Sequence, residues 1–261
     1  MRVILLGKHK RSAVGALEHL VQSGCDVVAV VAPPDPGDAI DSQRLDVAAR
    51  RHHIELATDD DLYARIGRDE LDDIDLVLSF LFWKRLRRPL IELGRIGCLN
   101  FHPAPLPDIR GLGGFNVAIL EGFQEWGVSA HFVDEEFDTG DLVEVERFPI
   151  APGATALSLD IDSQARLLGV FRRVIDAALA AGELPRTAQG DGRYVTREQF
   201  EAMRRVQPGE DAATLERRIR AFWYPPYDGA TMEVAGRTVT LVDRHLLDEV
   251  AAVNRRSGRV P

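Results

Sequence analysis

The sequence predicts an α/β fold: a mostly parallel, Rossmann-like sheet with helices on both faces, plus a small C-terminal appendage with a β-ribbon. Four near-continuous apolar runs are typical of strands that are covered on both faces. They occupy residues 2–7, 27–32, 75–80 and 96–101. Segments with helical spacing alternate with these runs, as in strand–helix–strand units. They occupy residues 12–23, 43–52 and 59–67.

The second half of the chain continues the pattern and then changes texture. A helix at 113–122 precedes two alternating segments that predict strands, at 127–134 and 142–149, and a long amphipathic helix at 155–181. Beyond residue 185 we expect a helix at 211–222, a hairpin joined through Ala235–Gly236, and an Arg-rich tail from about residue 250 that frays. The predicted division is therefore an N-terminal domain of residues 1–184 and a C-terminal region of residues 185–261.

Composition limits the classes of function. The chain has 261 residues and a net charge of −9, which disfavours nucleic-acid and anionic-membrane partners. Its two cysteines, Cys25 and Cys98, predict neither a disulfide framework nor a cysteine metal site, and we expect no metal. The apolar N-terminal run is too short for a signal peptide, and no run approaches the length of a membrane span. We therefore expect a cytoplasmic protein.

The turn after the first strand argues against a dinucleotide cofactor. It reads GKHKRSAVG, and Lys8 and His9 follow Gly7 where a dinucleotide-binding loop has its second glycine. Nucleophile-elbow and zinc-protease motifs are absent from the sequence. The chemistry must therefore come from other residues.

The segment LNFHPAPLPDIRG, residues 99–111, carries a polar pair at the end of the fourth predicted strand. Asn100 and His102 are two residues apart, so a strand would point both to the same face, at the edge where open α/β sheets bind ligands. The prolines that follow stiffen the loop. An amide beside an imidazole suits stabilisation of an oxyanion, although a hydrogen-bonded strand cap remains an alternative at this point.

An acidic turn, EEFDTGD, separates the last two predicted strands of the N-terminal domain. Its Asp138 would lie near the same sheet edge, where a carboxylate could orient His102 and accept a proton from an amine. An ordinary Asx-turn is the alternative, and Asp134 and Asp141 are competing carboxylates. Spacing alone leaves these possibilities open.

The segment NFHPAPLPDIRG, the downstream DEEFDTGD and the later IRAFWYPPYDGA together resemble the folate-dependent formyltransferase family. The resemblance is strong over about residues 75–150 and weaker over 1–75. It implies transfer of a formyl group from N10-formyltetrahydrofolate to an amine. It also implies that Asn100, His102 and Asp138 are the catalytic residues.

The resemblance further implies where the folate donor binds. Its pterin slot corresponds to Phe80, Leu81 and Phe82 with backbone groups near Val133 and Asp134. An apolar slot with a few backbone hydrogen bonds suits a flat heterocycle, although FLFW could equally be core. The loop contributes further candidates for donor binding: Leu106, Pro107, Arg110 and Gly111. Arg110 could meet an anionic portion of a substrate or form an ion pair with Asp108.

Several branches of this family differ in their acceptor. Residues 200–261 contain about as many arginines as acidic residues, 10 against 9, which disfavours tRNA and favours a small nucleotide-linked amino sugar. The alternatives are methionyl-tRNA, glycinamide ribonucleotide, an amino acid, hydrolysis of formyltetrahydrofolate, or binding without catalysis. A hydrolase would carry an N-terminal regulatory domain, whereas this sequence begins at its first strand.

The C-terminal region offers two further expectations. Trp223, Tyr224 and Tyr227 could stack on a base or pack internally, and the predicted β-ribbon could support a homodimer.

Overall fold

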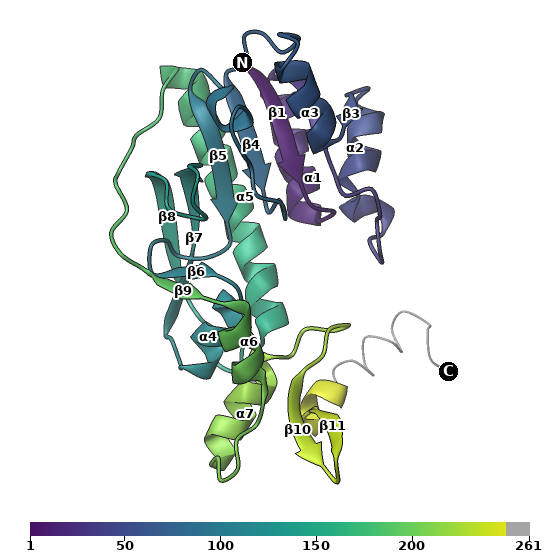
Figure 1. Cartoon of the computed structure of the whole chain (residues 1–261), viewed down its shortest axis with the longest axis vertical. Helices are drawn as coiled ribbons and strands as arrows, with labels where there is room; N and C mark the ends of the chain where they lie inside the picture. Colours follow the sequence, from purple (N-terminus) through teal and green to yellow (C-terminus); the bar gives the residue numbers. More distant parts are fainter. Residues whose placement is uncertain (249–261) are drawn as a thin grey trace. The chain divides into compact units, whose positions relative to one another are not determined.

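A computed structural model describes residues 1–248. Its main sheet has the strand order β3-β2-β1-β4-β5-β7-β8 (Figure 1). The strands are β1 (Arg2–Gly7), β2 (Asp26–Val31), β3 (Leu56–Ala57), β4 (Leu76–Phe80), β5 (Gly97–His102), β7 (Glu125–Phe132) and β8 (Leu142–Pro149). The first five pair in parallel, and β7 runs antiparallel to β5. The predicted fold class, an α/β protein with a mostly parallel sheet, is confirmed.

Helices cover both faces of this sheet. They are α1 (Arg11–Gln22), α2 (Leu45–Arg51), α3 (Asp59–Ile66) and α5 (Ala156–Ala181), with short 3-10 turns at Asp41–Gln43 and Leu90–Glu92. On one face, Ile4 and Leu6 of β1 join Leu62 of α3 in a buried cluster. On the other face, Phe80 and Phe101 pack against Phe171 of α5. Burial on both faces explains why these strands are almost continuously apolar.

The chain separates into two compact units. The first comprises residues 1–110, 127–148 and 162–193, and the second comprises 111–126, 149–161 and the chain from 194 onward. The described elements that lie mainly in the second are α4 (Gly114–Leu120), α6 (Arg197–Arg204), α7 (Ala212–Ala221), β10 (Ala230–Val234) and β11 (Arg237–Leu241). Two short strands, β6 (Ile109–Gly111) and β9 (Arg193–Val195), pair with each other. The division predicted at residue 184 stays a prediction.

The second unit contains polar contacts to its helices and a β-hairpin. Asn116 of α4 donates from its amide to the carbonyl oxygen of Ala221 at the end of α7 over 2.6 Å. The Arg218 guanidinium forms a buried ion pair with Glu210 at 2.7 Å. Strands β10 and β11 form the predicted antiparallel hairpin, in which Val234 pairs with Arg237.

Most predicted helices and strands are present within one or two residues of the expected bounds. Four short elements, β3, β6, β9 and α6, were not expected. The predicted Arg-rich tail from residue 250 lies outside the described residues. Within residues 1–248, no helix combines the length and apolar character needed to cross a lipid bilayer.

Candidate active site

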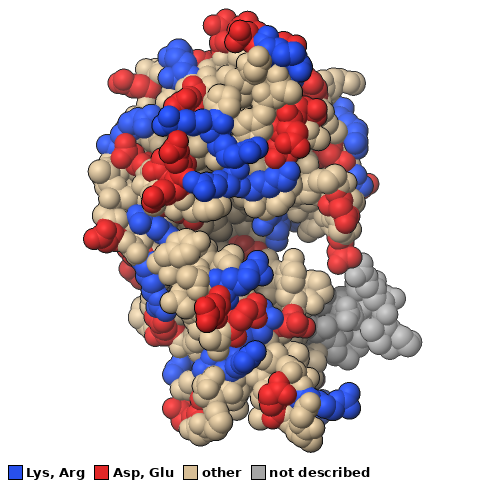
Figure 2. Space-filling model, viewed as in Figure 1, with Lys and Arg blue, Asp and Glu red and all other residues tan. Residues whose placement is uncertain are grey.

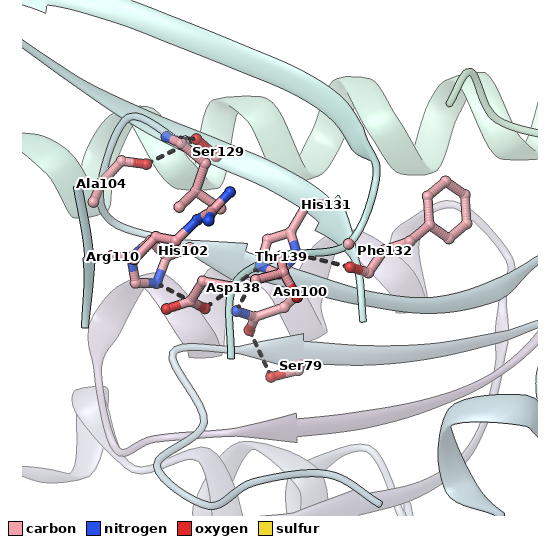
Figure 3. Close-up of polar contacts among 12 residues, drawn as sticks. Ser79, Asn100, His102, Ala104, Arg110, Ser129, His131, Phe132, Asp138 and Thr139 are labelled. Carbon is pink, nitrogen blue, oxygen red and sulfur yellow. Dashed lines mark hydrogen bonds and ion pairs between the residues drawn. The ribbon is translucent and has the colours of Figure 1, made fainter. Parts of the chain in front are cut away.

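Three polar side chains form a hydrogen-bonded row across neighbouring strands of the first unit (Figure 3). Strand register places Ser79 of β4 beside Asn100 of β5, and Asn100 beside His131 of β7. Ser79 Oγ donates to Asn100 Oδ1 over 2.8 Å, and Asn100 Nδ2 lies 3.1 Å from His131 Nε2. The Asn100 amide is therefore held from both sides.

The contacts of His131 determine the direction of the hydrogen bonds in this row. His131 Nδ1 lies 2.7 Å from the carbonyl oxygen of Phe132, which can only accept, so Nδ1 carries the proton. His131 Nε2 then accepts a hydrogen bond from the Asn100 amide. If the amide were reversed, Oδ1 would face the unprotonated Nε2 and the bond to His131 would be lost, so His131 sets the orientation of the amide. The second N–H of Asn100 has no acceptor among the described residues and remains available to a ligand.

His102 follows at the end of β5 and opens the proline-rich loop. It pairs in register with Ser129 of β7. The Ser129 hydroxyl donates to the carbonyl oxygen of Ala104 over 2.8 Å and accepts from the backbone N–H of Leu106 over 2.9 Å. This buried serine fixes the loop that follows His102, because its hydroxyl satisfies the carbonyl group of Ala104 and the N–H group of Leu106, which the sheet leaves without partners.

The Asp138 carboxylate lies between two imidazoles (Figure 3). Its Oδ1 is 3.7 Å from His102 Nδ1 and 3.7 Å from His131 Nε2. The side chain of Asp138 is 12% exposed and that of His102 is 17% exposed, so both are reachable from solvent yet largely shielded. The structure thus brings together the three residues that the sequence singled out as catalytic candidates.

The competing carboxylates have other partners. Asp134 Oδ1 accepts from the Thr139 hydroxyl over 2.6 Å and from the backbone N–H of Glu136 over 3.1 Å, so Asp134 shapes the turn itself. Asp141 Oδ2 lies 3.9 Å from the Arg186 guanidinium. Asp138 has a left-handed backbone conformation, with φ of 58°, which costs energy for a residue other than glycine. From this turn the Asp138 carboxylate reaches both histidines, whereas Asp134 and Asp141 pair elsewhere.

Burial sets the protonation state of His131. Its side chain is 2% exposed, and desolvation, reinforced by the nearby His102, lowers its pKa to about 4 despite the opposing effect of Asp138. His131 is consequently neutral at pH 7, as its role as acceptor from Asn100 requires. Its contact with Asp138 is therefore not an ion pair under those conditions.

A pH-dependent loss of stability follows from the lowered pKa of His131. The unfolded chain binds a proton near pH 6.5, whereas the folded chain binds it only near pH 4. Acid therefore favours the unfolded state, and stability is lost as the pH falls through this window. Between pH 7 and pH 4 we expect wild type to lose on the order of 3 kcal/mol relative to His131→Gln. Denaturant titrations of both proteins across this range measure the difference; a pH-independent difference would contradict the assignment.

A pocket of about 520 Å³ adjoins the acidic turn. Its lining residues come from the segment after β4 and from the turn between β7 and β8: Arg88, Ile91, Glu92, Val133, Asp134, Glu135, Glu136 and Thr139. Val133 and Asp134 were predicted to contact the folate donor, and both line this pocket. The other six lining residues were not among the predicted donor contacts.

The other candidates for donor binding occupy several environments. Phe80 and Leu106 are at most 1% exposed and belong to the core, whereas Leu81, with φ of 56°, and Phe82 are only partly buried. Pro107 is also partly buried, and Gly111, with φ of 83°, falls in the second unit. Arg110 donates from Nη2 to Gln189 Oε1 and to the carbonyl oxygen of Gly190, each over 2.9 Å. Asp108 pairs instead with Arg147, at 2.7 Å.

Sequence reasoning missed Ser79 and His131. Each is a polar residue inside an apolar strand segment, DLVLSF and GVSAHFVD respectively. That interruption is a usable signal, because a buried polar side chain needs a partner. Identifying the partner, however, required the register between β5 and β7.

A family model described as formyl transferase matches residues 1–165. The chain belongs to this family, the folate-dependent formyltransferases. The resemblance drawn from the sequence motifs is confirmed, and the protein is an N-formyltransferase. This formyltransferase is 30% identical over 240 residues to a methionyl-tRNA formyltransferase of Halorhodospira halophila, covering 88% of this chain and 75% of the relative. It is also 30% identical over 166 residues to a GDP-perosamine N-formyltransferase of Brucella melitensis, covering 63% of each chain.

Solved structures of N-formyltransferases share the fold. The enzyme from Helicobacter canadensis, in complex with folinic acid and dTDP-3-aminofucose, has a TM-score of 0.75 at 22% identity and covers 90% of this chain and 85% of its own. A 4-N formyltransferase from Francisella tularensis has a TM-score of 0.73 at 19% identity and covers 92% and 96% respectively. The fold shared with these two enzymes therefore covers about nine-tenths of this chain.

Proposed function

We propose that this formyltransferase transfers the formyl group of N10-formyltetrahydrofolate to the primary amine of a nucleotide-linked amino sugar. The observation that carries the proposal is the way in which the Asn100 side-chain amide is held. Ser79 and His131 fix its orientation and leave one N–H available, and His102 and Asp138 lie beside it. A preorganised donor next to an imidazole and a carboxylate is what an acyl-transfer reaction requires.

The reaction follows from these positions. The amine nitrogen attacks the formyl carbon, a C–N bond forms, and the carbonyl oxygen becomes an oxyanion. The available N–H of Asn100 and the imidazole of His102 stabilise that charge. Asp138 takes the proton that the attacking amine must lose, directly or through water. The bond from carbon to N10 then breaks, N10 takes up a proton, and the products are a formamide and tetrahydrofolate.

The pocket beside the acidic turn is the proposed donor site. It lies within the first unit and is lined by residues that include Val133 and Thr139, close in sequence to Asp138. Ile91 supplies an apolar wall, and the turn supplies backbone groups, which suits a pterin ring. A pterin bound there would bring the formyl group toward Asn100.

Charge supports a small acceptor over tRNA. The net charge of the chain is −9. In the second unit, several arginines are neutralised by carboxylates of the same unit: Arg218 by Glu210, Arg220 by Glu216, and Arg204 by Glu201 and Asp228. Acidic and basic side chains are also intermingled on the face drawn in Figure 2. An RNA backbone is held by many unpaired cations, so this arrangement favours a small ligand.

The relatives support an amino-sugar acceptor and also provide the second candidate for the acceptor. The Helicobacter canadensis enzyme is complexed with dTDP-3-aminofucose, and the Brucella melitensis relative is a GDP-perosamine N-formyltransferase. Methionyl-tRNA is the second candidate, because methionyl-tRNA formyltransferases of Halorhodospira halophila and Delftia acidovorans match 88% and 100% of this chain.

A panel of acceptors tests the proposal. The protein is incubated with N10-formyltetrahydrofolate and either a nucleotide-linked amino sugar, glycinamide ribonucleotide, a free amino acid or charged initiator tRNA. Tetrahydrofolate release and formamide formation are measured together. We expect equal amounts of both products with at least one nucleotide-linked amino sugar and none with tRNA. Turnover confined to tRNA would establish the runner-up, and release without any amine would establish a hydrolase.

A further inference from the structure

A segment far from the catalytic motifs in sequence contacts both loops that carry them. We call residues 186–193, RTAQGDGR, the strap. Thr187 exchanges two backbone hydrogen bonds with Leu142, at 2.8 and 3.0 Å, just after the acidic turn. At its other end the backbone N–H of Arg193 donates to the carbonyl oxygen of Asp108 over 3.1 Å. A Cβ on Gly192 would lie 1.7 Å from the carbonyl oxygen of Pro107, so the strap lies directly on the proline-rich loop.

Gln189 is the point where the strap joins the two loops. Its Nε2 donates to the carbonyl oxygen of Gly140 over 2.5 Å, and its Oε1 accepts from Arg110 Nη2 over 2.9 Å. Within residues 185–194, Gln189 is the one position that is partly buried, and its side chain turns inward to form these bonds. One amide thus uses both its donor and its acceptor to connect the acidic turn with the proline-rich loop.

This connection matters because the acidic turn is strained. Asp138, two residues before Gly140, has φ of 58°. Gly140 is packed so closely that a Cβ there would lie 2.0 Å from the carbonyl oxygen of Phe132. A turn that holds a costly conformation relaxes unless its surroundings prevent it. The bond from Gln189 restrains the carbonyl group of Gly140 and therefore the placement of the Asp138 carboxylate.

We propose that Gln189 is a positioning residue for formyl transfer: it holds the turn carrying Asp138 against the loop that follows His102, by bridging Gly140 and Arg110. This inference rests on the proposed function, because Asp138 is given its catalytic role there. Gln189 itself is not expected to contact the reacting atoms. Its effect passes through Asp138, and that dependence separates positioning from a general contribution to folding.

A double-mutant cycle tests the dependence. Gln189→Ala is expected to lower kcat about tenfold with less than about a twofold change in KM, since a misplaced catalytic group slows chemistry more than binding. In an Asp138→Asn background, the same substitution should lower kcat by less than about twofold, because the group that it positions has already been disabled. Equal losses in both backgrounds would overturn the inference.

Two further variants sharpen the result. Gln189→Glu keeps an acceptor for Arg110 but cannot donate to Gly140 when ionised, so its kcat should resemble that of Gln189→Ala. Gln124→Ala is the matched control, since the Gln124 amide also donates to a glycine carbonyl, that of Gly122, over 2.9 Å. It should retain wild-type kcat. A Gln189→Glu variant with wild-type kcat would contradict the role of the Gly140 bond.

Hydrogen exchange tests the strap without relying on activity. In Gln189→Ala, backbone amides of residues 135–141 should exchange faster than in wild type, with the exchange of β1 amides unchanged. Unchanged exchange in the turn would overturn the inference even if the enzyme is active. If wild type transfers no formyl group, the proposed function fails, whereas faster exchange in the turn would still establish the restraint.

Discussion

Replacing Asn100 with alanine is expected to lower kcat by about 100- to 1000-fold, with KM for the donor changed much less. The loss is of the size that follows removal of one preorganised oxyanion donor. The donor N–H of Asn100 acts on charge that develops only in the transition state, so ground-state binding depends on it little. Steady-state kinetics with a saturating amine measure both constants.

Ser79→Ala provides an internal control for this result. It removes the bond to Asn100 Oδ1 but leaves the bond between Asn100 Nδ2 and His131. The amide would then be held from one side only, and we expect kcat to fall by roughly tenfold or less. An Asn100→Ala enzyme with near-normal kcat would exclude Asn100 from the reaction.

Asp138→Asn is the second change with a large expected effect, a fall in kcat of about 100- to 10000-fold. The substitution keeps the size of the side chain, and asparagine tolerates the left-handed conformation found at this position. It removes the negative charge that lies 3.7 Å from both His102 and His131, together with the group proposed to accept the amine proton.

Asp141→Asn is the matched control for Asp138→Asn. Asp141 is a carboxylate three residues further along the same segment, and its nearest cation is Arg186 at 3.9 Å. We expect its kcat to stay within about twofold of wild type, since exposed ion pairs contribute little. Similar losses in the two variants would mean that the turn requires acidic residues in general and that Asp138 has no special role.

The sequence predicted the sheet well because apolar runs and helical spacing report directly on burial. The strand end and the stiff loop after it made Asn100 and His102 candidates, but the choice of Asp138 over Asp134 and Asp141 came from the resemblance to the formyltransferase family. His131 was missed because its function depends on lying opposite Asn100, and β5 and β7 are separated by more than twenty residues. Pairing of that kind is set by tertiary structure rather than by local pattern.

The strap illustrates a second limit of sequence reasoning. Residues 186–193 are polar and glycine-rich, which is typical of any surface connection. Gln189 becomes distinctive only through what its amide touches, namely Gly140 and Arg110. The Phe80 side chain shows the reverse case, since the motif FLFW was compatible with a ligand slot, yet Phe80 lies fully buried against Phe101 and Phe171.

The central claim is that Asn100, oriented by Ser79 and His131, promotes transfer of the formyl group to an amine. Its most direct test is a single-turnover experiment with an isotope-labelled formyl group on N10-formyltetrahydrofolate, in wild type and in Asn100→Ala, with donor binding measured in parallel. The claim predicts that the label moves to the amine in wild type, and at least about 100 times more slowly in the variant, while both proteins bind the donor with similar affinity. Transfer of the label at equal rates in the two proteins would contradict it.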